Sequence, residues 1–305
     1  MLENLRSAIK KIVKPDELLD GLNYTGIPSL RIFKSSNTTK LLQTAYEPSL
    51  FIILDGSKIV IFGNKTLKYD HNNYLVSSVL LPVSGKITKA STDKPFLSLQ
   101  ITFTMEQLFN AINDFSINLL KQSKTEFAVL SSEVTENLLY PVYALVKLLK
   151  SPQDIKALEN QYLKEILYRL LITDNNLALQ QLVFIENNAF KIAKTISYIN
   201  ENLYENLNMD ELAKYSNMCI AAFHKHFKNI TNVSPLQYIK IQRLQNAKKL
   251  IISSNMDISE ASFYVGYKSV SQFSREYSRY FGISPSEDIK QTKQAFFAYK
   301  TCSSP

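Results

Sequence analysis

The sequence predicts an α+β chain of two parts, a β-rich N-terminal part and an all-α C-terminal part built from two helix-turn-helix units. Three observations predict this. Short β-branched and aromatic runs with close turn signals fill residues 29–103, and the apolar period becomes helical from Met105. Two similar pairs of short helical segments then recur fifty residues apart. A chain of 305 residues is long enough for two domains.

The N-terminal part begins with a short helix within residues 1–23, whose apolar residues recur at helical spacing until Pro15 ends the pattern. The runs that read as strands lie at 30–33, 49–54, 58–62, 74–76 and 96–101. The turn signals between them lie at 55–57, 63–64, 70–73 and 84–85. Many short strands with close turns are typical of an antiparallel barrel or sandwich of about eight strands.

Helices are predicted from residue 105 to about residue 173, at 105–120, 131–149 and 154–171. Pro141 is expected to start or kink the second of them, and Pro152 separates the second from the third. Helices this apolar must bury one face. Either the barrel or a second subunit could cover that face.

From about Asn188 the chain is predicted to form short helices with recognisable ends. Asn208 caps one helix, Ser234 followed by Pro235 opens a long one, and Gly282 stops the last with a left-handed residue. The cap of the helix that starts near residue 258 is either Asp257 or Ser259. The expected helices are 190–202, 209–215, 219–229, 235–252, 258–265 and 269–281, with a final turn from Ser284-Pro285.

The repeat makes a geometric prediction. Phe223 matches Phe273 and Lys225 matches Arg275, each fifty residues on, and a Ser-Pro pair follows each unit. Two αα-hairpins that pack on each other are the alternative interpretation. DNA binding is favoured because residues 235–253 would form a helix of roughly 28 Å. Successive major grooves on one face of DNA lie about 34 Å apart, so such a helix could hold two recognition helices in adjacent grooves.

The charge supports this interpretation. The formal net charge is +8, of which residues 188–305 carry +6 and residues 1–187 carry +2. A basic C-terminal part is typical of nucleic-acid binding. The predicted long helix adds cations suited to phosphate contact, namely Lys240, Arg243, Lys248 and Lys249.

Catalytic and metal-binding patterns are missing from the sequence. His71 is the only histidine before residue 188, while His224 and His226 lie two apart on a helix and point in different directions. No phosphate-binding glycine loop, nucleophile elbow or zincin motif occurs. We therefore predict no enzyme, no catalytic residue, no metal and no cofactor.

Two cysteines are too few for a disulfide framework, and there is neither an apolar run of membrane-spanning length nor a signal-peptide core. We expect a cytoplasmic protein that does not contact a membrane.

The most specific motif runs from Val265 to Tyr277 and continues at Phe281-Gly282-Ile283-Ser284-Pro285, with support from 234–238 and 243–247. On these residues, 188–290 resembles the DNA-binding domain of the AraC/XylS family, a tandem helix-turn-helix of seven helices. The N-terminal part resembles the cupin-like sensor domain of one AraC-type subgroup. The segments that carry this second resemblance are 47–50, 74–77, 81–85 and 165–171.

The resemblance implies a domain organisation and a function. Residues 1–187 would form a cupin-like sensor and dimerisation domain, with strands at about 29–103 and helices at about 105–173. Residues 188–290 would form the DNA-binding domain, followed by a tail at 291–305. The function implied is sequence-specific regulation of transcription in response to a small-molecule effector. The implied partners are double-stranded promoter DNA, RNA polymerase, an effector and a second copy of the chain.

The resemblance also implies which residues read DNA. Arg275 can fork onto guanine O6 and N7, and Lys225 can reach a guanine or a phosphate. The DNA-binding set is predicted to be Ala221, His224, Lys225, Lys228, Arg243, Ser271, Ser274, Arg275 and Arg279. The sequence identifies no effector-binding residue, no effector and no operator. A ligand-binding or protein-interaction module without direct DNA binding is the alternative function.

Overall fold

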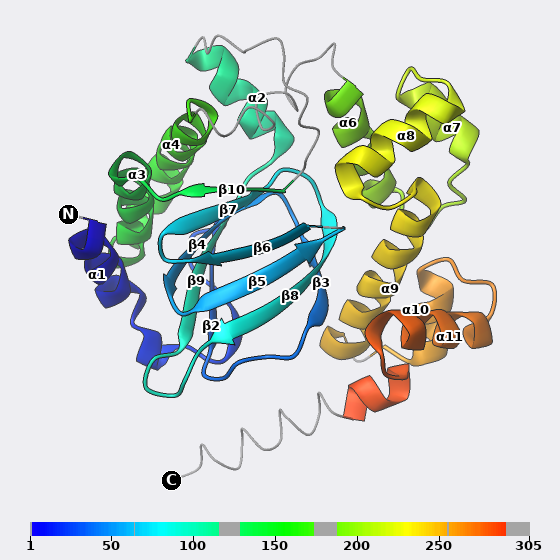
Figure 1. The fold of residues 1–305 in the computed structure, drawn as a ribbon, viewed down its shortest axis with the longest axis horizontal. Coiled ribbons are helices and arrows are strands. Elements are labelled where there is room, and N and C mark those ends of the chain that lie inside the picture. Colours follow the sequence, from blue (N-terminus) through cyan, green and yellow to red (C-terminus); the bar gives the residue numbers. More distant parts are fainter. Residues whose placement is uncertain (1, 64, 116–128, 174–187, 255, 291–305) are drawn as a thin grey trace.

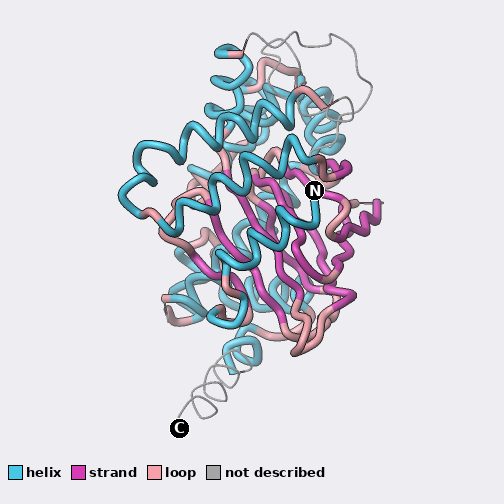
Figure 2. Tube along the Cα trace, turned by 90° about the vertical axis from the view of Figure 1, so that its left-hand side faces the viewer, coloured by secondary structure: helices cyan, strands magenta, loops and turns pink. Residues whose placement is uncertain are grey.

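The computed structural model describes residues 2–63, 65–115, 129–173, 188–254 and 256–290 (Figure 1). A β-rich N-terminal part lies beside a helical C-terminal part, which confirms the predicted fold class. Helices α1, α3 and α4 lie on one side of the strands, and helices α6 to α11 lie on the other. Figure 2, turned by 90°, shows the first group of helices crossing in front of the strands. The predicted tail at 291–305 lies outside the described residues.

Two antiparallel sheets form the N-terminal part. One sheet has the strand order β1-β2-β9-β4-β7-β10 and the other has the order β3-β8-β5-β6. The strands are β1 (Gly21–Tyr24), β2 (Leu30–Ser35), β3 (Leu42–Tyr46), β4 (Ser49–Asp55), β5 (Ser57–Phe62), β6 (Lys65–Asp70), β7 (Asn73–Ser77), β8 (Leu81–Lys89), β9 (Phe96–Thr102) and β10 (Val129–Glu133). The predicted antiparallel β architecture is confirmed. Strands β1, β3, β6, β8 and β10 were not among the runs that the sequence singled out.

The turn predicted at Ser84-Gly85 is wrong. Both residues lie inside β8, where Gly85 pairs with Leu42 of β3 on one side and with Val60 of β5 on the other. A Cβ atom at Gly85 would lie 3.0 Å from Cε of Lys58. The glycine therefore leaves room for the lysine side chain and does not mark a turn, which is one of the meanings of glycine inside a strand.

The helix predicted from residue 131 begins later than expected. Residues 129–133 form β10, which pairs with β7, and α3 (Glu136–Lys147) starts after its N-cap Thr135. The Thr135 hydroxyl accepts a hydrogen bond from the Leu138 amide at 3.3 Å. Pairing with a strand distant in sequence overrides the local helical pattern here. Pro141 lies inside α3.

The remaining N-terminal helices are α1 (Leu2–Val13), α2 (Met105–Asp114) and α4 (Pro152–Leu171), with short 3₁₀ turns η1 (Pro15–Glu17) and η2 (Leu148–Lys150). The helix predicted to run to residue 120 is described only as far as 114. The apolar faces of α3 and α4 meet each other, and α3 also contacts α1. The buried side chains of α4 are Leu163, Ile166, Leu167, Leu170 and Leu171. These helices therefore cover part of their apolar faces with one another.

The C-terminal part contains seven helices among the described residues. They are α6 (Asn188–Glu201), α7 (Met209–Tyr215), α8 (Ile220–Thr231), α9 (Pro235–Ser253), α10 (Ile258–Tyr264), α11 (Val270–Phe281) and a helix over 285–290. The predicted caps are confirmed, since the side chains of Asn208, Ser234 and Asp257 each accept a backbone N–H at the start of a helix. Asp257, not Ser259, is the cap of α10. Gly282 ends α11 with φ of 79°.

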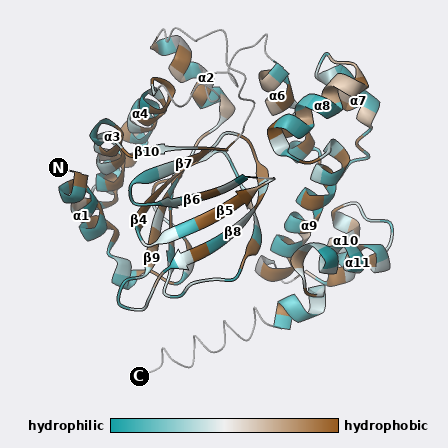
Figure 3. Cartoon of the chain, viewed as in Figure 1, coloured by the Kyte–Doolittle hydropathy of each residue, from teal (hydrophilic) through white to brown (hydrophobic). Residues whose placement is uncertain are grey.

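Two hydrophobic cores hold these parts together. The larger core is continuous from the strands and helices of the N-terminal part into α6, α7, α8 and the start of α9. A second, smaller core joins the rest of α9 to α10 and α11, and includes Leu244, Phe273 and Tyr277. Hydrophobic and hydrophilic residues alternate along helices α6 to α11, as expected for helices with one buried face (Figure 3).

Candidate DNA-binding surface and effector cavity

The two helix-turn-helix units share one turn geometry. We call α7–α8 unit 1 and α10–α11 unit 2. Asn217 and Gly266 hold the left-handed backbone position of each turn, with φ of 52° and 87°. The next residue donates its amide to a carbonyl five positions back, Met218 to Ala213 and Tyr267 to Ser262, both at 3.0 Å. The repeat read from the side chains is therefore also a repeat of the backbone.

The second helix of unit 1, α8, presents a basic face. Phe223 and Phe227 are fully buried, and their rings meet edge to face at 5.5 Å. Ala221, Lys225 and Lys228 are exposed and recur at four- and three-residue spacing, so they share one face of α8. His224 is half-buried, with its ring edge-on to that of Phe223.

The second helix of unit 2, α11, presents a matching face. Ser271, Arg275 and Arg279 are exposed at four-residue intervals, and Ser274 is half-buried. Nε of Arg275 donates to the Ser271 carbonyl at 3.3 Å, so the side chain lies along α11 as far as this atom. Phe273 is fully buried on the opposite side. The structure thus gathers the sequence-predicted residues of each unit on one helix, with the bulky aromatic residues turned inward.

Three of the four basic residues of α9 bond to partners within the chain, unlike the exposed basic residues of α8 and α11. Arg243 donates from Nε to the Leu203 carbonyl at 2.9 Å and from Nη2 to the Glu205 carbonyl at 2.8 Å. Burial lowers the pKa of its guanidinium. Lys240 pairs with Glu276 at 3.2 Å and Lys248 with Asp288 at 2.5 Å, while Lys249 is exposed. A DNA contact by Arg243 stays a prediction, and the structure gives its guanidinium intramolecular partners.

Two carboxylates that organise unit 2 were missed from the sequence. Glu276 accepts hydrogen bonds from Lys240, Tyr267 and Gln272. Burial raises the pKa of Glu276, but these hydrogen bonds outweigh it and hold that pKa below its usual value. The four-residue spacing of Gln272 and Glu276 was the only local signal.

Asp288, in the last helix, is the second of these carboxylates. It is buried and accepts a hydrogen bond from the Tyr277 hydroxyl at 2.7 Å, besides its ion pair with Lys248. No sequence pattern connects residue 288 with residue 248, forty positions earlier. The structure thus ties the last helix to both α9 and α11.

The start of α9, where Tyr238 packs on Phe227 of unit 1, is fastened to the N-terminal part through the same tyrosine. The hydroxyl of this fully buried residue at the start of α9 donates to the Leu80 carbonyl at 2.9 Å. It also accepts from Nδ2 of Asn200 in α6 at 3.1 Å. Burial raises the pKa of the Tyr238 hydroxyl well above its usual value.

A cavity of about 240 Å³ lies between the two sheets of the N-terminal part. Aromatic rings line much of it, and those of Tyr46 and Phe51 stack at 4.4 Å. Nζ of Lys58 lies 5.2 Å from the ring centroid of Tyr46 and 5.7 Å from that of Phe33. The cavity therefore combines aromatic walls with the ammonium group of Lys58, while the Glu47 carboxylate in the same lining is paired with Arg31.

The cavity shares a wall with the groove between the two parts of the chain. Arg31 and Glu47 form an ion pair there, and both side chains line the cavity and the groove. Nε2 of Gln100 donates to Glu47 at 3.3 Å from the cavity side. Lys248 and Lys249 of α9 line the far side of the groove. The Arg31–Glu47 pair therefore lies in the wall between the cavity and the groove that α9 borders.

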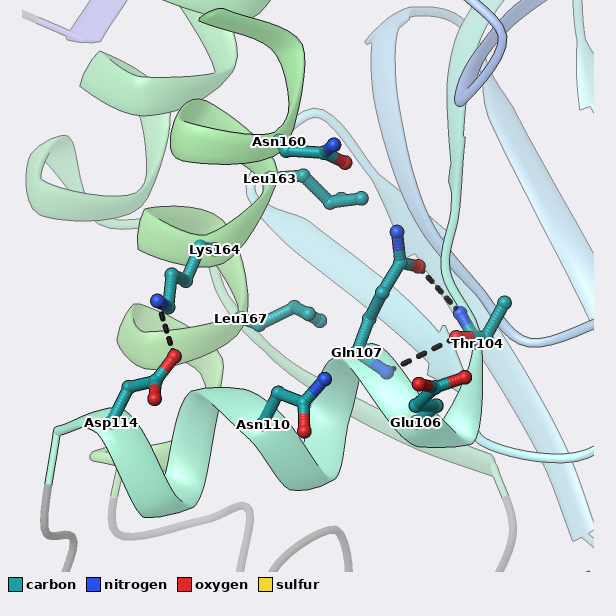
Figure 4. Close-up of a pocket in the computed structure, with 9 residues that line it drawn as sticks. All are labelled: Thr104, Glu106, Gln107, Asn110, Asp114, Asn160, Leu163, Lys164 and Leu167. Carbon is teal, nitrogen blue, oxygen red and sulfur yellow. Dashed lines mark hydrogen bonds and ion pairs between the residues drawn. The ribbon is translucent and has the colours of Figure 1, made fainter.

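A second hollow lies between α2 and α4 (Figure 4). Thr104 and Gln107 bond reciprocally at the start of α2, at 2.8 and 3.1 Å, in the manner of a capping box. Lys164 of α4 pairs with Asp114 of α2. Because its polar groups serve to cap α2 and to join it to α4, we interpret this hollow as a helix junction and not as the effector site.

The described residues contain no group of three or more potential metal ligands. No helix among them is long and apolar enough to cross a membrane.

Comparison with known proteins decides the family. Residues 26–177 match the model of the AraC-type transcriptional regulator N-terminus, and residues 212–291 match that of a helix-turn-helix domain. The chain belongs to the AraC/XylS family. It is a DNA-binding transcription regulator and not an enzyme, as the sequence predicted.

Relatives of this AraC/XylS-family regulator include the lactose operon transcription activator of Staphylococcus xylosus, which is 25% identical over 75% of this chain and 81% of that protein. The transcriptional activator RhaS of Escherichia coli is 25% identical over 53% of this chain and 58% of RhaS. Among solved structures, ToxT from Vibrio cholerae O395 bound to (E)-4-(8-methylnaphthalen-1-yl)but-3-enoic acid superposes with a TM-score of 0.60 at 15% identity, over 86% of this chain and 98% of ToxT. ToxT with a bound unsaturated fatty acid gives a TM-score of 0.53 at 14% identity, over 86% and 93% of the two chains. These likenesses in structure support the same overall fold.

Proposed function

We propose that this regulator places α8 and α11 in successive major grooves of promoter DNA, with residues 188–290 as the DNA-binding domain. The observation that carries the proposal is the position of the two units at opposite ends of one helix, α9 (Figure 1). Its 19 residues span roughly 28 Å at about 1.5 Å per residue. That length is close to the distance of about 34 Å between successive major grooves.

The exposed faces of the two helices supply the contacts. We assign guanine recognition to Arg275 and base or phosphate contacts to Lys225. Lys228 and Arg279 stand at the next exposed positions toward the helix ends and suit phosphates. Ala221, Ser271 and Ser274 are small enough for the helices to enter the groove closely, and Ala221 can meet a thymine methyl group. His224 is half-buried, as is Ser274, and can donate to a base edge.

A titration on duplex DNA at 50 and 200 mM salt tests DNA binding itself. If the chain neutralises about four phosphates, affinity should fall on the order of a hundredfold between these concentrations. The probe is a random-sequence duplex long enough for two helical turns. An affinity that does not change with salt, or no binding at 50 mM, would favour the alternative of an interaction module without direct DNA contact.

We further propose that residues 1–187 sense a small-molecule effector in the cavity between the sheets. Its volume of about 240 Å³ is below the roughly 300–1,000 Å³ of sites for drug-sized ligands, so the effector should be small. Lys58 would pair with an acidic group while the rings around it cover an apolar body. The ligands of the two ToxT structures, a fatty acid and an aryl butenoic acid, are carboxylic acids with apolar bodies, which supports this class.

The Lys58→Met variant should lose affinity for a small aryl carboxylate such as 4-phenylbutanoate. A charged hydrogen bond of about 1.5–3 kcal/mol corresponds to a loss of roughly 10- to 150-fold. Calorimetry with the acid and with its neutral amide measures this. Wild type should prefer the acid, and the variant should bind both alike. Lys68→Met, at an exposed position of β6, is the matched control and should behave as wild type. Equal loss of acid and amide binding would contradict the role of Lys58.

We also propose that the regulator acts as a homodimer in the cytoplasm, where it contacts RNA polymerase at its promoters. Two of the relatives are named activators of transcription, which supports a contact with polymerase. A dimer would cover a direct or inverted repeat of the site that one protomer reads.

A further inference from the structure

One side chain forms hydrogen bonds to both sides of the seam between the two helix-turn-helix units. Arg243, near the middle of α9, bonds to the Leu203 and Glu205 carbonyls in the connection from α6 to α7. On the other side, Nη1 reaches the Gly266 carbonyl at 3.4 Å, in the turn between α10 and α11. The guanidinium therefore holds the loop that leads into unit 1 and the turn of unit 2 at once.

The turn of unit 2 is shaped to receive this guanidinium. A Cβ atom at Gly266 would lie 3.0 Å from Cζ of Arg243, which is closer than nearly all such contacts. Gly266 thus serves two needs, a left-handed φ of 87° and a close approach to Arg243. The rings of Tyr204 and Tyr264, 4.9 Å apart, cross the same seam beside it.

Among the described residues no continuous hydrophobic core joins the two units. The core that contains α6, α7, α8 and the start of α9 is separate from the core of α10 and α11. The start of α9, where Tyr238 packs on Phe227 of unit 1, is also tied to the N-terminal part through the Tyr238 hydroxyl. The angle between α8 and α11 therefore depends on the stiffness of α9, on the polar seam at Arg243 and on the contact of α11 with β3.

The chemistry of the seam suits a rigid joint. The planar guanidinium has donors in a fixed fork, and its partners are backbone carbonyls, which cannot rotate away as a side chain could. Burial lowers the pKa of Arg243, which reflects its partial withdrawal from solvent, yet an arginine stays charged at any physiological pH.

We propose that Arg243 is a positioning residue that sets the distance and angle between α8 and α11, and thereby the spacing of the two half-sites that the chain accepts. The inference rests on the proposed function, because spacing matters only if both helices enter the DNA. It gives Arg243 a part in specificity that requires no contact with DNA.

Selection from a duplex pool tests this. The pool carries two random blocks whose centres lie about 8 to 13 base pairs apart, which brackets one helical turn of about 10.5 base pairs. The full chain is compared with Arg243→Met and with Lys249→Met, a matched removal of an exposed cation from the same helix.

Wild type should favour one spacing about tenfold over its neighbours, the effect of one mismatched base pair. In Arg243→Met the preference should flatten to about threefold or less, while Lys249→Met keeps the wild-type peak. An unchanged peak with uniformly weaker binding would overturn the proposal, since a phosphate contact or a general loss of stability predicts that result. If wild type itself enriches a single block, the two-groove function fails, and the inference fails with it.

A second variant covers the case in which Arg243→Met does not fold. Gly266→Asn keeps a residue that tolerates the left-handed turn, as Asn217 does in unit 1, but its Cβ displaces the guanidinium. Its preferred spacing should shift or broaden. A peak that coincides with that of wild type would count against the role of Arg243 just as clearly.

Discussion

Replacing Arg275 with alanine is expected to weaken binding to the preferred site by about 1–3 kcal/mol, a loss of roughly 5- to 150-fold. The physical reason is the loss of a forked donor that can meet guanine O6 and N7 together. Arg275 is exposed on the face of α11 that also carries Ser271. Competition among duplexes that differ at one base pair measures the change, and preference should relax at one position of the site.

The neighbouring cation is the matched control. Arg279 is exposed one turn further along the same face and is assigned to a phosphate. Arg279→Ala should weaken binding to all sequences alike and reduce the slope of log affinity against log salt by about one. If Arg275→Ala weakens random and preferred DNA to the same extent, Arg275 does not read a base.

Replacing Phe273 with alanine should unfold unit 2 and leave the rest of the chain folded. Removal of a buried phenylalanine costs about 3–5 kcal/mol. Phe273 is fully buried in the smaller core, between Tyr267 and Tyr277. A core of so few residues has little stability to lose, and it is not continuous with the core of the N-terminal part.

Hydrogen exchange with mass spectrometry measures this locally. Amides of α10 and α11 should lose protection in Phe273→Ala, while those of the strands keep theirs. Phe223→Ala is the matched control at the equivalent position of unit 1, whose core is continuous with the strands. Its effect should extend from α8 into the N-terminal part. Equal loss of protection everywhere in Phe273→Ala would show that the two cores unfold as one.

The helix ends of the C-terminal part were predictable because their signals are local. A side chain such as that of Asn208 or Ser234 accepts a hydrogen bond from a backbone N–H two or three residues further along. Both partners of the cap therefore lie within a few residues of each other in the sequence. The strands were less predictable. β10 and the middle of β8 take their structure from strands far away in the sequence, and Gly85 is explained only by the Lys58 side chain beside it.

The candidate site likewise has one part that the sequence could predict and one part that it could not. The exposed face of α11 followed from helical spacing, which separates Arg275 from Phe273 without knowledge of the fold. The role of Arg243 did not, because its partners at Leu203, Glu205 and Gly266 lie 23 to 40 residues away. On sequence alone it was one more cation on a basic helix.

By itself, then, the sequence determined the fold class, the two repeated units and the faces of their second helices, since periodicity and capping act over a few residues. The tertiary structure alone decided which cations are exposed and which are held by partners within the chain. It also decided where Lys58 lies among the aromatic rings. The physical reason is that a charge takes its role from its nearest partners, and in this chain those partners are brought near by folding.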